Sequence, residues 1–510
     1  MPPYYNKLNL IYGGGMELHR EQLIFQNGER FSCLSDANGV PDFWTTLFLT
    51  THYRGSTQET MRNISNVLVH FLLWDGMQEQ SFFEKVVSIA DADETAPASL
   101  FSRPEFLSTL EARSLAHHCK LQTKAVRRKH TQKTESNVIS MRAQLPSSVV
   151  PDEVVGVKLH RHRLTVVAEF LHFIVDVGLR HYSHYANYLD AAEKVKQVII
   201  KQRPKRQDTR AKRNDPDKKA PPPEVFEEIM RIAEPEFIDN PFTALVRERN
   251  YLIIRVLYDT GMRVGELLQL KVSDVNFAAQ TISIVRRHDD PEDIWRGLEP
   301  NAKTLERDLP ISLELIDLLR DYVTGERRHM VQTLPASQSH GFLFVSSKNT
   351  VGQPLSIKQC SKLLLKIARD KGLASFIEAE GIKVDKLAGA HAYRHNRNNL
   401  ISRIIDINNH LAREEGRIDN IISEKKEIQI RMYLMGHSNQ KSAEVYNLRH
   451  TKESAEKISM ALMKNEAAKV RKSISKGESE ISEEELERLI PSVLGVAYEL
   501  TDNAEKDKKL

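Results

Sequence analysis

Several residues that could act on a phosphodiester follow one another in the second half of the chain. Arg263 comes directly after a glycine turn and is expected to open a helix, with Glu266 three residues later on the same face. A guanidinium at a helix start points the same way as the free backbone amides, so both can bind an anion. By themselves, these two residues could equally form a capped helix with a surface ion pair.

Three further positions carry groups of the same kind. Lys303 precedes a short apolar strand and is expected on a β-hairpin. His391 and Arg394 are three residues apart on a predicted helix, which places an acid–base group beside a phosphate-binding group. The spacing His-x-x-Arg is not sufficient alone, because it recurs at His160/Arg163 and at His410/Arg413.

The last of these groups lie near residue 440, where His437 follows Gly436 and Tyr446 comes nine residues after His437. A tyrosine phenol can attack phosphorus and form a covalent phosphoenzyme. Arginines can neutralise the phosphate oxygens, and lysine or histidine can protonate the leaving alkoxide. No carboxylate triad typical of two-metal nucleases is visible, and no nucleotide-binding glycine loop, so we expect no metal and no cofactor.

One group of residues in the sequence could instead form a zinc site. Its ligands would be His117, His118, Cys119 and His130. Zinc sites use paired ligands at regular spacing, which this group lacks, so we do not favour zinc there.

The elements that must position these groups follow from hydrophobic periodicity and turn signals. Helices are predicted at residues 56–80, 164–179, from 224 onward, 245–260, 313–323, 356–369 and 391–405, and strands at 281–285 and 342–345. A hairpin of residues 23–25 and 31–34 is predicted around Asn27-Gly28. The fold class is therefore mainly α with a small β-sheet.

We expect five regions along the chain. Residues 1–40 form an N-terminal extension, 41–200 a helical domain with an insertion at about 100–160, 201–223 a linker, 224–455 the domain with the candidate site, and 456–510 a helix and acidic tail. The linker contains nine Lys or Arg, among them Lys205, Arg206, Lys212 and Arg213. It could be a solvated hinge or could also follow a phosphate backbone, and both readings stay open.

Composition excludes several classes of protein. With 510 residues, 40% hydrophobic and 28% charged, the chain is neither disordered throughout nor collagen-like. It has no apolar run long enough for a membrane span, and its three distant cysteines suit a reducing compartment, so a cytoplasmic location is expected. A net charge of +4 is too small to indicate nucleic-acid binding alone.

Four segments together resemble a known family. YDTGMRVGELLQLKVSDV, the KT before a strand, HAYRH and LMGHSNQKSAEVYNLRH are similar to the catalytic domain of tyrosine recombinases, the phage integrase family, over roughly residues 223–450. The resemblance implies a helical core-binding domain and an α+β catalytic domain that form a clamp around DNA. It also implies roles for seven residues. Arg263 and Arg394 bind the scissile phosphate, Lys303 protonates the 5′-oxygen, His391 and His437 assist proton transfer or bond to the phosphate, Glu266 supports the site, and Tyr446 is the nucleophile.

One departure from the family pattern concerns spacing. Arg394 and His437 are 43 residues apart, further than is usual, and the excess includes the polar stretch 408–426. That stretch contains the rival pair His410/Arg413. We prefer His391/Arg394, because a glycine-alanine turn precedes it and the expected helix follows it.

The implied function is a site-specific recombinase or integrase that cleaves and rejoins DNA through a 3′-phosphotyrosyl intermediate, integrating or excising a mobile element without metal or ATP. Its partners would be double-stranded DNA, three further copies in a homotetramer on two DNA sites, and an accessory DNA-bending or excision factor. It would be nucleoid-associated, with no membrane partner. Two alternatives remain: a non-catalytic DNA-binding protein with this fold, and a type IB topoisomerase-like enzyme.

Overall fold

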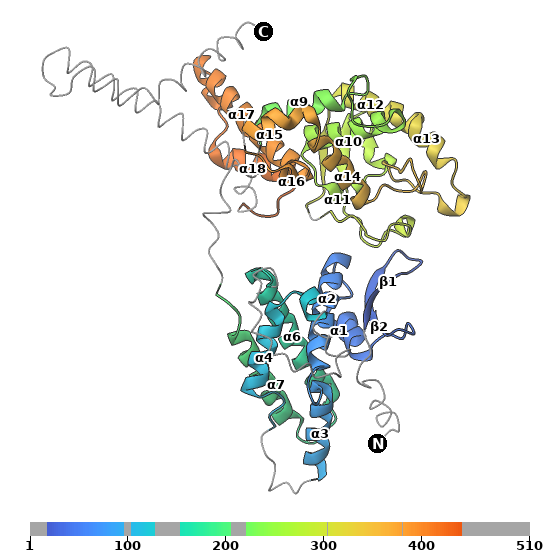
Figure 1. Cartoon of the computed structure of the whole chain (residues 1–510). Coiled ribbons are helices and arrows are strands. Elements are labelled where there is room, and N and C mark those ends of the chain that lie inside the picture. Colours follow the sequence, from blue (N-terminus) through green and yellow to red (C-terminus); the bar gives the residue numbers. More distant parts are fainter. Residues whose placement is uncertain are drawn as a thin grey trace, which may run out of the picture. The chain divides into compact units, whose positions relative to one another are not determined.

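The computed structural model describes residues 18–95, 104–127, 154–205, 221–302, 304–379 and 381–440. The chain divides into two compact units, Met1–Arg210 with Arg287–Asn301, and Ala211–Arg286 with Ala302–Leu510 (Figure 1). Several residues singled out in the sequence lie outside the described part: Lys303, Tyr446, Arg206, Lys212, Arg213, His130, and the predicted C-terminal helix and tail.

Unit 1 begins with the predicted hairpin and continues with helices. Its elements are β1 (His19–Ile24), β2 (Arg30–Ser35), α1 (Phe43–Tyr53), α2 (Gln58–Asp75), α3 (Phe82–Thr95), α4 (Thr109–Lys120), α6 (Val157–Gly178), α7 (Tyr185–Lys201) and the 3₁₀ turn η6 (Pro291–Asp293). The hairpin is antiparallel with Leu23 opposite Phe31, and all of β2 is buried. Its side chains join the helical core, so residues 30–35 are part of this unit rather than of a separate extension.

The core of unit 1 explains the order of its helices. Phe48 of α1, Leu68 and Phe71 of α2, and Leu171 of α6 are almost completely buried, and within α2 Ile64, Leu68 and Phe71 recur at three- and four-residue spacing. The ring of Phe48 packs against that of Phe170 with the centroids 5.1 Å apart. Helix α4, which falls in the predicted insertion, contributes Leu115 to the same core. The described part of that segment is therefore integral to the fold rather than decoration.

Unit 2 places a small sheet among helices. It consists of α9 (Pro223–Ala233), η4 (Ala244–Val246), α10 (Arg247–Thr260), α11 (Val264–Gln269), η5 (Val272–Asp274), β3 (Val275–Asn276), β4 (Thr281–Ile284), β5 (Arg307–Pro310), α12 (Leu313–Thr324), α13 (Glu326–Val331), η7 (Ala336–Gln338), α14 (Ile357–Ala368), η8 (Lys371–Leu373), α15 (Ala374–Ala379), α16 (Val384–Leu387), α17 (Ala390–Glu414), η9 (Ile418–Asn420) and α18 (Glu424–Met435). The antiparallel sheet has the order β3-β4-β5, with Ile282 paired to both Val275 and Leu309.

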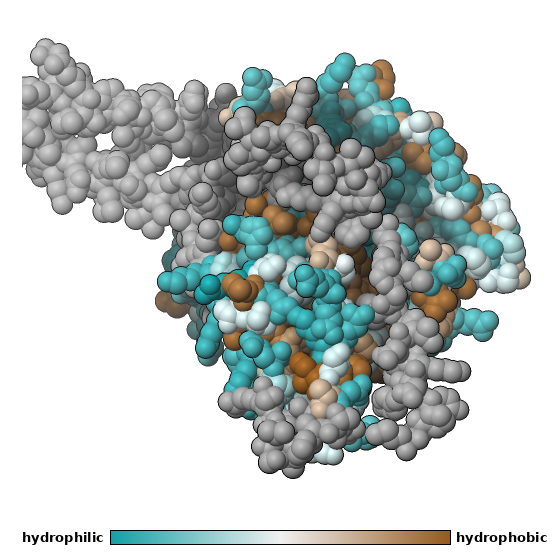
Figure 2. All heavy atoms as spheres, turned by 60° about the horizontal axis from the view of Figure 1, so that its bottom comes forward, coloured by the Kyte–Doolittle hydropathy of each residue, from teal (hydrophilic) through white to brown (hydrophobic). Residues whose placement is uncertain are grey.

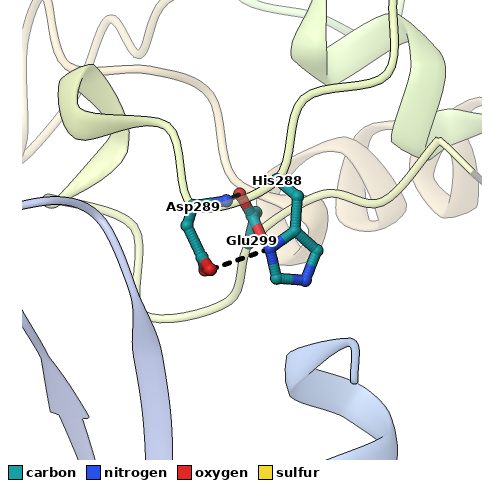
Figure 3. Close-up of side chains that lie close together, drawn as sticks. All are labelled: His288, Asp289 and Glu299. Carbon is teal, nitrogen blue, oxygen red and sulfur yellow. Dashed lines mark hydrogen bonds and ion pairs between the residues drawn. The ribbon is translucent and has the colours of Figure 1, made fainter. Parts of the chain in front are cut away.

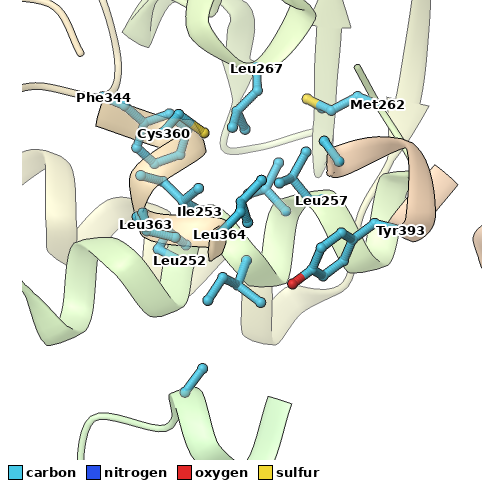
Figure 4. Close-up of a cluster of buried hydrophobic side chains, with 14 of the residues drawn as sticks. Leu252, Ile253, Leu257, Met262, Leu267, Phe344, Cys360, Leu363, Leu364 and Tyr393 are labelled. Atoms are coloured by element: carbon cyan, nitrogen blue, oxygen red, sulfur yellow. The ribbon is translucent and has the colours of Figure 1, made fainter. Parts of the chain in front are cut away.

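Helix α10 lies at the centre of the unit 2 core. Ile253 and Leu257 have no exposed surface and pack among Leu364, Met262 and Tyr393 (Figure 4). The helix ends at Gly261, whose φ of +64° makes it a left-handed cap at the glycine turn that the sequence indicates. A Cβ at this position would lie 2.8 Å from Cβ of Arg397, so α17 passes directly against the turn that precedes Arg263.

Two predicted elements differ from the structure. Residues 342–345 form only isolated bridges, Lys271 with Phe342 and Val345 with Pro354, so the predicted strand is absent there. The helix predicted at 391–405 continues to Glu414, so the first part of the polar stretch is helical, and α18 begins only at its end, at Glu424. An exposed helix can be polar on most of its surface, so the polar composition did not reveal that the helix continues.

Apolar residues outside the cores are scattered. Figure 2 shows brown and teal residues intermixed on the face in view, and the exposed large hydrophobic side chains come from many different elements. Within the described ranges, we find no helix with the length and hydrophobicity that crossing a membrane requires.

Candidate active site

The first element of the candidate site is the turn between α10 and α11. Arg263 is the N-cap residue of α11, and its backbone N–H donates to Oε2 of Glu266 at 3.2 Å. The guanidinium Nη1 lies 3.5 Å from Oε1 of Glu266 and makes no hydrogen bond to any residue that the structure describes. Since 25% of the Arg263 side chain is exposed, this guanidinium is held at one end and can receive an anion.

Glu266, which contacts Arg263, is itself held by further hydrogen bonds. Its carboxylate is completely buried and accepts from Nη2 of Arg307 at 2.9 Å and from the hydroxyl of Thr304. A buried carboxylate is stable only when it is paired in this way. Glu266 therefore connects the start of α11 to the chain immediately after Lys303.

Arg307 is a site residue whose role the sequence did not reveal. Its Nε donates to the backbone oxygen of Leu434 at 3.0 Å, and Nη1 donates to Thr304 at 3.2 Å. The side chain thus joins β5 to the end of α18. The signal that was available is strand alternation, because Arg307 and Leu309 are the buried positions of β5.

Arg394 connects the two turns that hold the other candidate residues. It is completely buried, Nη1 donates to the backbone oxygen of Gly261 at 3.0 Å, and Nη2 donates to that of Met435. Nη2 also lies 2.9 Å from Nε2 of His437. In this structure Arg394 positions the Gly261 turn and His437, and the phosphate contact implied by the resemblance stays a prediction.

His437 follows the left-handed cap of α18. Gly436 has a φ of +60°, and a Cβ there would lie 2.4 Å from Nη1 of Arg307, so only glycine fits. His437 is 2% exposed, and burial followed by the charges of Arg394 and Arg263 lowers its pKa to about 3. The imidazole is therefore neutral near pH 7.

His391 lies in the first turn of α17, on the solvent side of the site. His391 as a whole is exposed to solvent. Its pKa is nevertheless lowered, first by partial burial of the ring and then by the charges of Arg263 and Arg394. Arg394 follows His391 by three residues on the same helix, and the charge of Arg263 also acts on His391. The rival His410 lies 19 residues further along α17, roughly 28 Å away, where it is 70% exposed and pairs with Glu414 at 3.1 Å. His410 and Arg413 are therefore not part of this cluster.

The remaining sequence candidates are the linker cations and the pair His160/Arg163. Lys205 is exposed just after α7, and it is the one of the four linker cations that the structure describes. His160 and Arg163 are structural, since Arg163 is buried and donates to the backbone oxygen of Leu121 at 2.6 Å.

The zinc alternative conflicts with the observed contacts. His118 Nε2 lies 2.8 Å from the backbone oxygen of His70, and Arg163 Nη1 lies 3.0 Å from Nε2 of His70. Burial raises the pKa of the Cys119 thiol to about 12, whereas a zinc ligand must be a thiolate. These side chains stabilise the core of unit 1.

Comparison with known proteins identifies the region that carries this site. Residues 223–408 match the model of the phage integrase family. Transposase A from transposon Tn554 of Staphylococcus aureus is 26% identical over 127 residues, which is 25% of this chain and 32% of that protein. Tyrosine recombinase XerA of Pyrococcus furiosus is 26% identical over 216 residues, which is 42% of this chain and 55% of that protein. The chain thus spans about a third to a half of the length of these curated relatives.

A solved structure of the Tn1549 transposon integrase in complex with transposon right end DNA has 14% sequence identity and a TM-score of 0.38, covering 79% of this chain and 93% of that one. Arg263, Glu266, His391 and Arg394 all lie inside the segment that matches the family model, whereas His437 and Tyr446 lie beyond it. Residues 223–408 therefore form a phage integrase family domain, and tyrosine recombinases are among the curated proteins similar to it.

Proposed function

We propose that the chain is a site-specific recombinase that cleaves and rejoins double-stranded DNA, with Tyr446 as nucleophile, during integration or excision of a mobile element. The observation that carries this proposal is the convergence of Arg263, His391, Arg394 and His437 around a buried Glu266–Arg307 pair. Such a cluster supplies positive charge and neutral imidazoles at one place, which suits a phosphate that gains charge during the reaction.

The proposed step is a transfer of the phosphoryl group. The Tyr446 oxygen attacks phosphorus, the bond from phosphorus to the 5′-oxygen breaks, and the 3′-phosphate becomes esterified to the tyrosine. Arg263 neutralises the non-bridging oxygens, and Lys303 protonates the departing 5′-oxygen. Neutral His391 is suited to accept the phenolic proton, while His437 donates a hydrogen bond to the phosphate. A 5′-hydroxyl attacks the phosphotyrosine in the reverse step and releases the enzyme.

A nicked suicide substrate tests the nucleophile. The full chain should form a covalent adduct that survives SDS, and Tyr446→Phe should form none. Tyr433→Phe is a suitable control, because Tyr433 is 57% exposed on α18, four residues before His437. An adduct formed by Tyr446→Phe, or lost only in Tyr433→Phe, contradicts the assignment. Absence of any adduct from the full chain on its own target would favour a non-catalytic DNA-binding protein.

The proposed chemistry uses neither ATP nor a divalent ion. The charge on the phosphate is met by arginines, so cleavage should continue at an unchanged single-turnover rate in EDTA. Loss of cleavage in EDTA that Mg²⁺ specifically restores would overturn this part of the proposal.

The proposed assembly is a homotetramer on two DNA sites, because strand exchange between two duplexes needs four tyrosines. An accessory DNA-bending or excision factor would set the direction. Lys205, Arg206, Lys212 and Arg213 would add affinity that does not depend on sequence. Replacing all four with Gln should flatten the salt dependence of DNA binding; an unchanged salt slope would leave the linker as a hinge.

A further inference from the structure

The segment Arg287–Asn301 connects β4 to β5 along the chain but belongs to unit 1. It is held there by paired contacts with α2, since Nε2 of Gln58 donates to the backbone oxygen of Gly297 at 2.7 Å and the backbone N–H of Glu299 donates to Oε1 of Gln58 at 2.8 Å. At Gly28 of the hairpin turn, a Cβ would lie 2.5 Å from the backbone oxygen of Asp289. The segment is therefore fitted closely against the rest of the unit.

The segment contributes buried charged side chains that pair with Arg30 of the hairpin, and the two carboxylates differ in how closely they are paired. Asp293 receives two guanidiniums, Arg296 at 2.5 Å and Arg30 at 3.4 Å. Glu299, whose side chain is 1% exposed, has one guanidinium nearby, and that contact is longer, 3.7 Å from Oε1 to Nη1 of Arg30. The carboxylate of Glu299 is thus less compensated than that of Asp293, and burying such a charge is costly.

The side chains of His288, Asp289 and Glu299 lie close together, with the ring of His288 joined to the carboxylate of Asp289 (Figure 3). Nδ1 of His288 is 2.8 Å from Oδ2 of Asp289, and the backbone N–H of Asp289 donates to Oε1 of Glu299 at 2.8 Å. One donor atom from each of the three side chains lies within 4.8 Å of the other two. The second oxygen of Glu299, Oε2, is buried and has no hydrogen-bond partner among the described residues.

We propose that His288, Asp289 and Glu299 bind a divalent transition-metal ion, Zn²⁺ or Mn²⁺, that fixes the segment Arg287–Asn301 on unit 1. Metal–nitrogen and metal–oxygen bonds of about 2.0–2.2 Å hold ligand atoms at most about 4.4 Å apart, so small side-chain rotations complete the site. The ion would give Oε2 of Glu299 a partner and balance the two carboxylates.

The donor set decides the class of ion. Carboxylates suit Mg²⁺, Ca²⁺ and Mn²⁺, whereas an imidazole ligand favours Zn²⁺ and other transition metals. His288 and Asp289 are 41% and 28% exposed, so water can occupy the remaining coordination positions. The site lies within unit 1 and takes no part in the phosphoryl transfer proposed for unit 2. The sequence analysis did not find this site, because Asp289 and Glu299 are ten positions apart and match no metal-binding spacing.

Calorimetric titration of the full chain, freed of metal with EDTA and then exchanged into buffer, tests the proposal. ZnCl₂ or MnCl₂ should bind at one strong site per chain, and MgCl₂ should not compete at equal concentration. Glu299→Gln, Asp289→Asn and His288→Ala should each weaken binding by at least about 10-fold, the smaller effect known for residues that only support metal ligands. Glu21→Gln, an exposed carboxylate on β1, is the matched control and should bind normally.

Stability gives a second readout that separates ion binding from misfolding. All three tryptophans, Trp44, Trp74 and Trp295, belong to unit 1, so tryptophan fluorescence follows the unfolding of this unit. The ion should raise the melting temperature of the wild type but not that of Asp289→Asn or His288→Ala, whose side chains are partly exposed and tolerate substitution. An absence of strong binding to the wild type, or equal binding by these two variants, overturns the proposal. Equal weakening by Glu21→Gln would place the ion elsewhere and overturn it as well.

Discussion

The guanidinium of Arg394 lies 2.9 Å from the imidazole of His437, although 43 residues separate them in the sequence. The same guanidinium donates to the backbone oxygens of Gly261 and Met435. One buried side chain thus fixes the distance between the turn that presents Arg263 and the loop that presents His437. Arg394 therefore supplies positive charge to the cluster and also holds its two turns in place.

Arg394→Met should destabilise unit 2 by at least about 1–3 kcal/mol, because it leaves buried backbone oxygens without donors. Cleavage should fall with it, since His437 loses its partner. The tryptophans report only on unit 1. Unfolding of unit 2 is therefore measured by far-UV circular dichroism, as the loss of signal that is not accompanied by a change in tryptophan fluorescence. Arg413→Met, on the exposed part of the same helix, should change neither quantity. Equal stability of the two variants would contradict the bracing role.

The depressed pKa of His437, about 3, predicts how stability depends on pH. An unfolded histidine binds a proton near pH 6.5, whereas the folded imidazole stays neutral, so the unfolded state holds more protons below that pH. The contribution of His437 to stability is therefore complete above pH 6.5 and is lost as the pH falls toward 3. NMR of histidine-labelled protein, assigned with His437→Gln, should show a neutral ring at pH 5. A ring that titrates near pH 6.5 would refute this environment.

The buried pair Glu266–Arg307 should be strongly coupled. Arg307→Met leaves the carboxylate of Glu266 without its closest cation and should cost about 3–5 kcal/mol in stability of unit 2. In a double-mutant cycle, Arg307→Met with Glu266→Gln should cost less than the sum of the two single changes. Glu306→Gln, an exposed neighbour on the same segment, is the control. Additive single effects would show that the pair is not coupled.

His391 and His410 separate the two His-x-x-Arg pairs in a direct comparison. His391→Ala should lower the single-turnover cleavage rate by roughly 10- to 10,000-fold, the range that acid–base groups supply. His410→Ala should cleave at nearly the wild-type rate, because its ring is in solvent and pairs only with Glu414 among the described residues. The reverse ranking would move the active site to His410 and Arg413.

Most of the helices, the N-terminal hairpin and the family of residues 223–408 were predictable from the linear pattern of residues. Periodic apolar residues predicted α2, α6, α10, α12 and α14, and Asn27-Gly28 predicted the hairpin. These features depend on neighbours a few residues apart, so they are visible in a linear pattern. The prediction of a strand at residues 342–345 was wrong, because a short apolar segment can be buried equally well without pairing to another strand.

Which side chains meet across the fold could not be predicted from the sequence. Arg307 and Glu266 are 41 residues apart, and neither signals its partner, since any buried charge can be paired by any cation that the fold brings within reach. The same holds for Glu299, whose two neighbours lie ten and eleven residues earlier in the sequence. The local sequence already favoured His391 over His410, and the structure adds that the charge of Arg263 acts on His391, whereas His410 is exposed and pairs with Glu414.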